Sequence, residues 1–211
     1  GTGLQYSESV QDIIGDPVMQ ILGASDTSFH GMGREDIDVR CLGSGRPFVL
    51  EIKNPRLREF ELSKIEKKIN SNKPEKVRVN SLKWCTKKDV SRVKETRSEK
   101  SYTIRFKVDN PISEQEAAKS IEALSGVTLE QETPKRVSHR RAAKTRKRRV
   151  TSISNILVEE DEIQFSLRCE AGTYVKELVH SDEGRTSPSV SSVIERECVV
   201  LWLDVDEIHA D

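Results

Sequence analysis

The densest cluster of residues that could do chemistry lies between positions 31 and 46. It contains Arg34, Glu35, Asp36 and Asp38, with glycines on both sides. Glycines let a loop turn tightly and let a substrate approach the backbone closely. Neighbouring arginines favour the ionised form of a carboxyl group, which can then act as a nucleophile, a general base or a metal ligand. The cluster therefore predicts a catalytic carboxylate, whose reaction depends on the residues that it meets.

One hypothesis is a magnesium-dependent nuclease. Asp38 precedes the tripeptide Glu51-Ile52-Lys53, an order similar to that of restriction-type nucleases. In such a site the two acids would hold Mg²⁺ and Lys53 would assist the attacking water. This pattern is short and common by chance.

A second hypothesis is that Asp36 alone acts on a nucleobase. The chain must then supply an aromatic ring to hold the base by stacking, and a cation to keep the carboxylate charged in a closed pocket.

A basic stripe, defined here as residues 135–149, points to a polyanionic partner. The stripe has nine lysines and arginines and no acid, although the net charge of the chain is zero. It would bind RNA or DNA at one place on an otherwise acidic body and so orient it. A third hypothesis is therefore a non-catalytic RNA-binding module. The stripe's cationic residues are Lys135, Arg136, His139, Arg140, Arg141, Lys144, Arg146, Lys147, Arg148 and Arg149.

Length and composition bound the class of protein. The 211 residues suit one large domain or two small ones, and 33% charged residues indicate a thin core with long solvated loops. The four cysteines lack the close spacing of a zinc site and are expected to be free thiols. The longest apolar run is too short to cross a bilayer and the N-terminus has no signal pattern, so a soluble, cytoplasmic protein is expected.

Short alternating strands supply most of the expected core. Strands are predicted at 46–53, 101–108, 163–169 and 199–205, where apolar residues alternate with polar ones. One helix is expected from a Ser113–Glu116 capping box to Gly126, another from Pro188, and a third over 61–70. Residues 83–100 are expected to form a projecting hairpin or loop. The order of elements favours an α+β fold with a largely antiparallel sheet.

Four runs of sequence, in order, carry a resemblance to a known family. They are residues 30–40, 43–47, 133–142 and 171–180, the last followed by Gly184-Arg185-Thr186 and Pro188. Together they resemble the archaeal and eukaryotic tRNA pseudouridine synthases of the TΨC arm, the Pus-ten family. The resemblance implies one pseudouridine synthase catalytic domain over residues 1–211, with a mixed, mostly antiparallel sheet, flanking helices and a central cleft. It also implies isomerisation of uridine in tRNA without a metal or organic cofactor.

The resemblance also implies roles for individual residues. Asp36 matches the catalytic aspartate, and Tyr102 the tyrosine that stacks on the target base and takes part in removing the C5 proton. Lys176 matches the cation placed against the catalytic carboxylate, with Arg34 as a second electrostatic partner. Two further residues would line the pocket wall, Tyr174 and Leu178.

The chain departs from the family at two places. Relatives generally carry an N-terminal RNA-binding half with cysteine zinc ligands, which is missing here. We expect a monomer that acts on tRNA. Because that half is missing, we expect a separate subunit or domain to complete RNA binding. Where relatives have His-Gly-Asp-Phe-Gly-Arg, this chain has His-Ser-Asp-Glu-Gly-Arg at residues 180–185.

Overall fold

The computed structural model describes residues 7–210, which form two compact units. The first unit contains the described residues up to Met32 together with Pro47–Thr96. The second contains Gly33–Arg46 and the described residues from Arg97 onward. The loop that carries the acidic cluster therefore belongs to the second unit.

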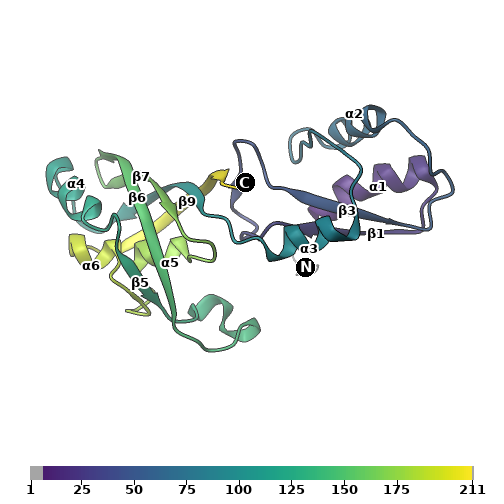
Figure 1. Cartoon of the computed structure of the whole chain (residues 1–211). Helices are drawn as coiled ribbons and strands as arrows, with labels where there is room; N and C mark the ends of the chain where they lie inside the picture. Colours follow the sequence, from purple (N-terminus) through teal and green to yellow (C-terminus); the bar gives the residue numbers. More distant parts are fainter. Residues whose placement is uncertain (1–6, 211) are drawn as a thin grey trace. The chain divides into compact units, whose positions relative to one another are not determined.

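The first unit packs two helices against a two-stranded ribbon (Figure 1). Helices α1 (Val10–Leu22) and α2 (Leu62–Asn72) lie beside the antiparallel pair β1 (Asp26–Gly31) and β3 (Phe48–Lys53). Their shared core contains Ile14, Val18, Leu22, Ile65, Ile69 and Val79, against which the ribbon's apolar side chains pack. The predicted strand at 46–53 and helix at 61–70 are confirmed.

The prediction of a hairpin or loop at 83–100 is wrong. The segment contains helix α3 (Lys87–Glu95), which begins with a capping box between Thr86 and Asp89. That pair satisfies backbone donors at the helix start, and this local signal outweighs the high charge of the segment. Val93 is the residue of α3 that is buried.

The second unit is built on a seven-stranded sheet, in the order β2-β9-β4-β7-β6-β5-β8. Adjacent strands pair antiparallel except for β2 and β9, which are parallel. The strands are β2 (Arg40–Cys41), β4 (Lys100–Val108), β5 (Thr128–Gln131), β6 (Arg146–Glu159), β7 (Glu162–Cys169), β8 (Thr186–Ser187) and β9 (Cys198–Ile208). The predicted α+β fold with a mostly antiparallel sheet is confirmed.

The predicted alternation in β4 sets the core of this sheet. Tyr102, Ile104, Phe106 and Val108 are all buried, and Phe106 meets Phe165 of β7 edge to face with ring centroids 5.9 Å apart. Burying side chains of this size contributes roughly 1.5–3 kcal/mol each. The packing of these side chains along β4 therefore fixes the side of the sheet to which Tyr102 points.

Three short helices flank the sheet, as Figure 1 shows. They are α4 (Glu114–Glu122), α5 (Val175–His180) and α6 (Val190–Ile194). Ser113 caps α4 by accepting a hydrogen bond from the Glu116 N–H, as predicted, although the reciprocal contact from the Glu116 side chain is not formed. Pro188 precedes the cap of α6, which is Ser189.

All four cysteines are free, as expected, with Cys169 and Cys198 buried. Burial raises the pKa of each of these two thiols to about 12. Within the described part of the chain, no helix combines the length and apolarity needed to cross a membrane.

Candidate active site

The loop from Gly33 to Arg46 is fastened to β9. Arg40 donates two hydrogen bonds to the Asp204 carboxylate, at 2.8 and 2.5 Å, and the Leu42 N–H donates to the Val205 carbonyl at 2.8 Å. At Gly43 a side-chain Cβ would lie 1.9 Å from the backbone oxygen of Asp206, so only glycine fits there. This close approach fixes the loop that presents Asp36.

Asp36 is surrounded by cations from two distant segments. Its Oδ2 accepts a hydrogen bond from Arg136 Nη1 at 2.6 Å and lies 3.7 Å from Lys176 Nζ, while Oδ1 lies 3.9 Å from Arg140 Nη2. The side chain is 26% exposed, so the carboxylate is largely withdrawn from solvent. The structure therefore brings Asp36 and Lys176 together.

Arg34, the second predicted partner of Asp36, is placed differently. Its side chain is exposed, and no ion pair joins it to Asp36 in the described residues. Arg136 and Arg140, which belong to the basic stripe, take that place.

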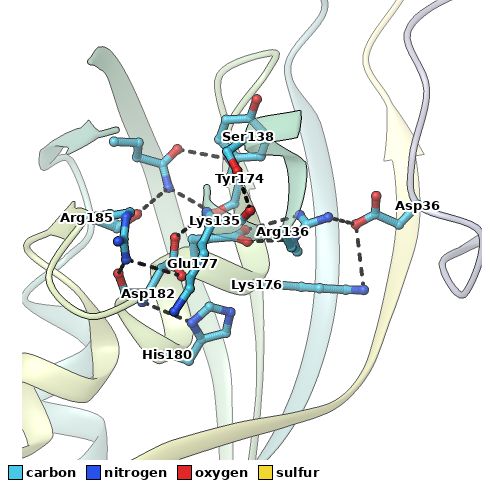
Figure 2. A network of polar contacts seen from close by, with 12 residues as sticks. Asp36, Lys135, Arg136, Ser138, Tyr174, Lys176, Glu177, His180, Asp182 and Arg185 are labelled. Atoms are coloured by element: carbon cyan, nitrogen blue, oxygen red, sulfur yellow. Dashed lines mark hydrogen bonds and ion pairs between the residues drawn. The ribbon is translucent and has the colours of Figure 1, made fainter. Parts of the chain in front are cut away.

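Arg136 is itself held by a buried acid. Its Nε and Nη2 donate to the two carboxylate oxygens of Glu177, at 2.6 and 3.2 Å. The Glu177 side chain is 1% exposed, so an ion in this place needs a well-aligned partner. Figure 2 shows the guanidinium of Arg136 between Glu177 on one side and Asp36 on the other. Burial lowers the pKa of Arg136, but pairing with Glu177 and Asp36 outweighs it, so the pKa is raised.

Lys176 lies between two aspartates. Its Nζ donates to both carboxylate oxygens of Asp38, at 2.9 and 2.8 Å, and is farther from Asp36. Desolvation opposes ionisation of Asp38, but the hydrogen bond and charge of Lys176 lower its pKa overall. Because the folded pKa is lowered, the pair's contribution to stability is present above the ordinary aspartate pKa and is lost as the pH falls through the folded value.

A buried amide positions the helix that carries Lys176 and Glu177. Gln131 of β5 donates to the Tyr174 carbonyl and accepts from the Tyr174 N–H, both at 2.9 Å. This clamps the start of α5. Leu178, predicted to line the pocket wall, is fully buried, and Tyr174 is partly buried. Their proposed contacts with a base stay predictions.

Tyr102 is almost entirely buried, with 4% of its surface exposed. Its hydroxyl donates to Glu35 Oε1 at 3.4 Å, so the ring lies beside the residue that precedes Asp36. Burial, reinforced by the negative charge of Glu35, raises the pKa of Tyr102 well above its ordinary value. The side chain therefore remains a neutral phenol at physiological pH.

The basic stripe does not form one continuous face. Lys135–Arg140 form a short 3-10 helix (η1), whereas the stripe's C-terminal end, from Arg146, enters strand β6. Side chains alternate along a strand, so Arg146 and Arg148 lie on the opposite face from Lys147 and Arg149. Five exposed members form no ion pair within residues 7–210: His139, Arg141, Lys144, Lys147 and Arg149.

The residues of the nuclease hypothesis have other partners. Asp38 pairs with Lys176, Glu51 with His30 at 3.2 Å, and Lys53 with Asp26 at 2.9 Å. Within residues 7–210, no group of three or more histidine, cysteine or acidic side chains is arranged to hold a metal ion. The nuclease hypothesis is not favoured.

Three important residues of the site were not identified from the sequence, namely Glu35, Gln131 and Glu177. Glu35 precedes Asp36 and Glu177 follows Lys176, so both glutamates lie within the family motifs. Nothing in the sequence, however, distinguishes a glutamate that is withdrawn from water from a solvated one. Gln131 is fully buried at the end of β5. An alternating strand pattern that buries Leu129 and Gln131 is the signal that could have found it.

The fold is shared with chains of known complexes. A chain in the crystal structure of a Cbf5-Nop10-Gar1 complex matches 95% of this chain with a TM-score of 0.59 and 15% identity, using 45% of its own length. A chain in the crystal structure of an archaeal box H/ACA sRNP Nop10-Cbf5 complex matches 94% with a TM-score of 0.51 and 12% identity, using 43% of its length.

Sequence comparison identifies the family. Residues 2–209 match the family described as Pus10, C-terminal. The tRNA pseudouridine synthase Pus10 of Methanocaldococcus jannaschii is 42% identical over 208 residues, covering 99% of this chain and 45% of the relative. That of Methanothrix thermoacetophila is 42% identical over 207 residues, covering 98% and 46%. The chain belongs to the Pus10 C-terminal family, which confirms the resemblance, and it spans about half the length of these relatives.

Proposed function

We propose that this chain is the catalytic part of a tRNA pseudouridine synthase that acts in the TΨC arm, with both units forming one catalytic domain. The observation that carries the proposal is the Asp36 carboxylate, largely withdrawn from water and paired with Arg136 and Lys176. The membership of this chain in the Pus10 C-terminal family and the names of its relatives support the same activity.

The reaction needs a charged carboxylate and no change of oxidation state. The bond between N1 and the ribose C1′ breaks, the uracil turns, and C5 bonds to C1′. One proton leaves C5 and one is gained at N1, so the atoms balance without a cofactor. Asp36 supplies the carboxylate for this sequence, while the fixed positive charges around it keep it ionised in the pocket.

Tyr102 is the proposed support for the uracil. Because the ring is 4% exposed, the side chains that cover it must move when a base stacks on it. Flipping the target nucleotide out of its stack costs a few kcal/mol, which must come from RNA binding elsewhere. Leu178 and Tyr174 complete the proposed pocket wall.

The activity is tested directly on an unmodified tRNA transcript. The protein is incubated with the transcript in EDTA, and pseudouridine is mapped by carbodiimide labelling. We expect pseudouridine in the TΨC arm and an uncut strand. A transcript that is bound but contains no pseudouridine would favour the RNA-binding module. In a parallel incubation with Mg²⁺ in place of EDTA, a cut strand would favour the nuclease.

We further propose that the exposed cations of the basic stripe bind tRNA phosphates. Replacing Lys147 and Arg149 with Gln should make the negative slope of log affinity against log salt shallower by about 1 to 2, because each phosphate contact contributes roughly −0.7 to −0.9. The matched control replaces Lys67 and Lys68, two exposed lysines of α2, with Gln. An equal change of slope in the control would contradict the assignment of the tRNA surface to the stripe.

A further inference from the structure

A second ionic cluster lies beside Asp36, centred on Glu35. A single carboxylate oxygen, Glu35 Oε1, accepts hydrogen bonds from Lys100 Nζ at 2.6 Å, Arg46 Nη2 at 3.2 Å and Tyr102 Oη at 3.4 Å. The Glu35 side chain is 17% exposed, and those of Lys100 and Arg46 are 9% and 16% exposed. This is a largely buried carboxylate with two cations and one phenol as donors.

The cluster joins the strand to the loop. Lys100 and Tyr102 are two positions apart on β4, so their side chains point to the same face of the sheet. Arg46 is the last residue of the loop that begins at Gly33. Glu35 therefore fastens this loop to β4 at the position immediately before Asp36.

The contacts of Glu35 favour one geometry. A carboxylate withdrawn from water is stable only while its donors stay in place, so movement of Glu35 away from Lys100 and Arg46 is costly. The same oxygen fixes the direction of the Tyr102 hydroxyl. Since Glu35 and Asp36 are consecutive, restraining one restrains the backbone of the other.

We propose that Glu35 is a positioning residue. It holds the Asp36 carboxylate and the Tyr102 ring in a fixed position relative to each other, so that both can act on the target uridine. The proposal rests on the proposed function, because the two groups act at different steps of that reaction. Asp36 is needed for breakage of the N1–C1′ bond. We assign the Tyr102 ring to the later step, in which C5 has bonded to C1′, the C5 proton passes to water and N1 gains a proton from water.

The test replaces Glu35 with Gln, which keeps the size and an acceptor oxygen but removes the charge. We expect a single-turnover rate about 10- to 100-fold lower, since a displacement of about 1 Å at a reacting group has an effect of this size. The affinity for tRNA should change less than about twofold, because Glu35 makes no proposed phosphate contact. The matched control is Glu99→Gln, which breaks the pairing of Glu99 with Arg168 and Thr151 in the same unit.

Two further measurements separate positioning from a general loss of structure. With uridine deuterated at C5, the isotope effect on the rate should be larger in Glu35→Gln than in the unaltered protein, because loss of the C5 proton becomes slower. The NMR signal of the Tyr102 ring, assigned with Tyr102→Phe, should shift in Glu35→Gln and stay in place in Glu99→Gln.

The outcomes distinguish this inference from the proposed function. If the unaltered protein makes no pseudouridine, the proposed function fails, while the Tyr102 signal still reports whether Glu35 positions the ring. If the protein is active but Glu35→Gln retains its rate, its isotope effect or its Tyr102 signal, the positioning role is overturned. A rate that falls only in proportion to the folded fraction also overturns it.

Discussion

The Asp36→Asn variant is expected to lose pseudouridine formation, by at least about a thousandfold, while tRNA affinity changes less than about twofold. Asparagine has nearly the same shape but cannot carry the negative charge that the reaction needs. The fold should persist, because Arg136 keeps Glu177 as a partner and Lys176 keeps Asp38. Single-turnover kinetics and tRNA titration measure the two quantities separately.

The neighbouring aspartate provides the control. Asp38 also pairs with Lys176, but its side chain is 65% exposed, against 26% for Asp36. Since exposed ion pairs contribute little, we expect Asp38→Asn to lower the rate by less than about tenfold. If Asp36→Asn kept a tenth or more of the activity, or if Asp38→Asn had the larger effect, Asp36 would not be the catalytic carboxylate.

The second large effect is expected at Arg136. Replacing Arg136 with Met leaves the buried Glu177 without its cation and Asp36 without its shortest ion pair. Removing one partner of a buried pair costs 3–5 kcal/mol, and because Arg136 is 35% exposed we expect about 3 kcal/mol at most. The rate should fall about a hundredfold, since the orientation of Asp36 is no longer fixed. Denaturant unfolding and single-turnover assays measure these effects.

A double variant separates the two roles of Arg136. In Arg136→Met combined with Glu177→Met, no unpaired charge is buried, so most of the lost stability should return. The activity should stay low, because Asp36 still lacks the guanidinium. Lys135→Met is the control, since Lys135 makes an exposed pair with Glu183 and should change stability by less than about 1 kcal/mol. Recovery of both stability and activity in the double variant would limit Arg136 to a structural role.

Much of the second unit could be predicted from local patterns. The alternation from Tyr102 to Val108 and the cap at Ser113 describe features that depend on a few neighbouring residues, and both are confirmed. Helix α3 was missed because its charged sequence buries little besides Val93. Hydrophobic periodicity is a weak signal where a helix rests on a single buried residue.

The site was predicted in part. The family motifs predicted that Asp36 and Lys176 lie together, and in the structure Lys176 Nζ is 3.7 Å from Asp36 Oδ2. The motifs did not show that Arg136 would turn toward Asp36, because a run of basic residues has the same charge whichever way its side chains face. That direction depends on η1 and on Glu177, which lies 41 positions along the chain.

The amino-acid sequence by itself determined the family and the α+β class and predicted Asp36 as the catalytic carboxylate, since motifs and periodicities within short stretches encode these features. Only the tertiary structure decided the partners of that carboxylate and divided the basic stripe between an inward group at Arg136 and Arg140 and an outward one. The cation partners of Glu177, which is buried, and of Glu35, which is largely buried, are set by strand register and by the attachment of the loop. Those choices depend on contacts across 41 to 100 positions of chain, which no local pattern contains.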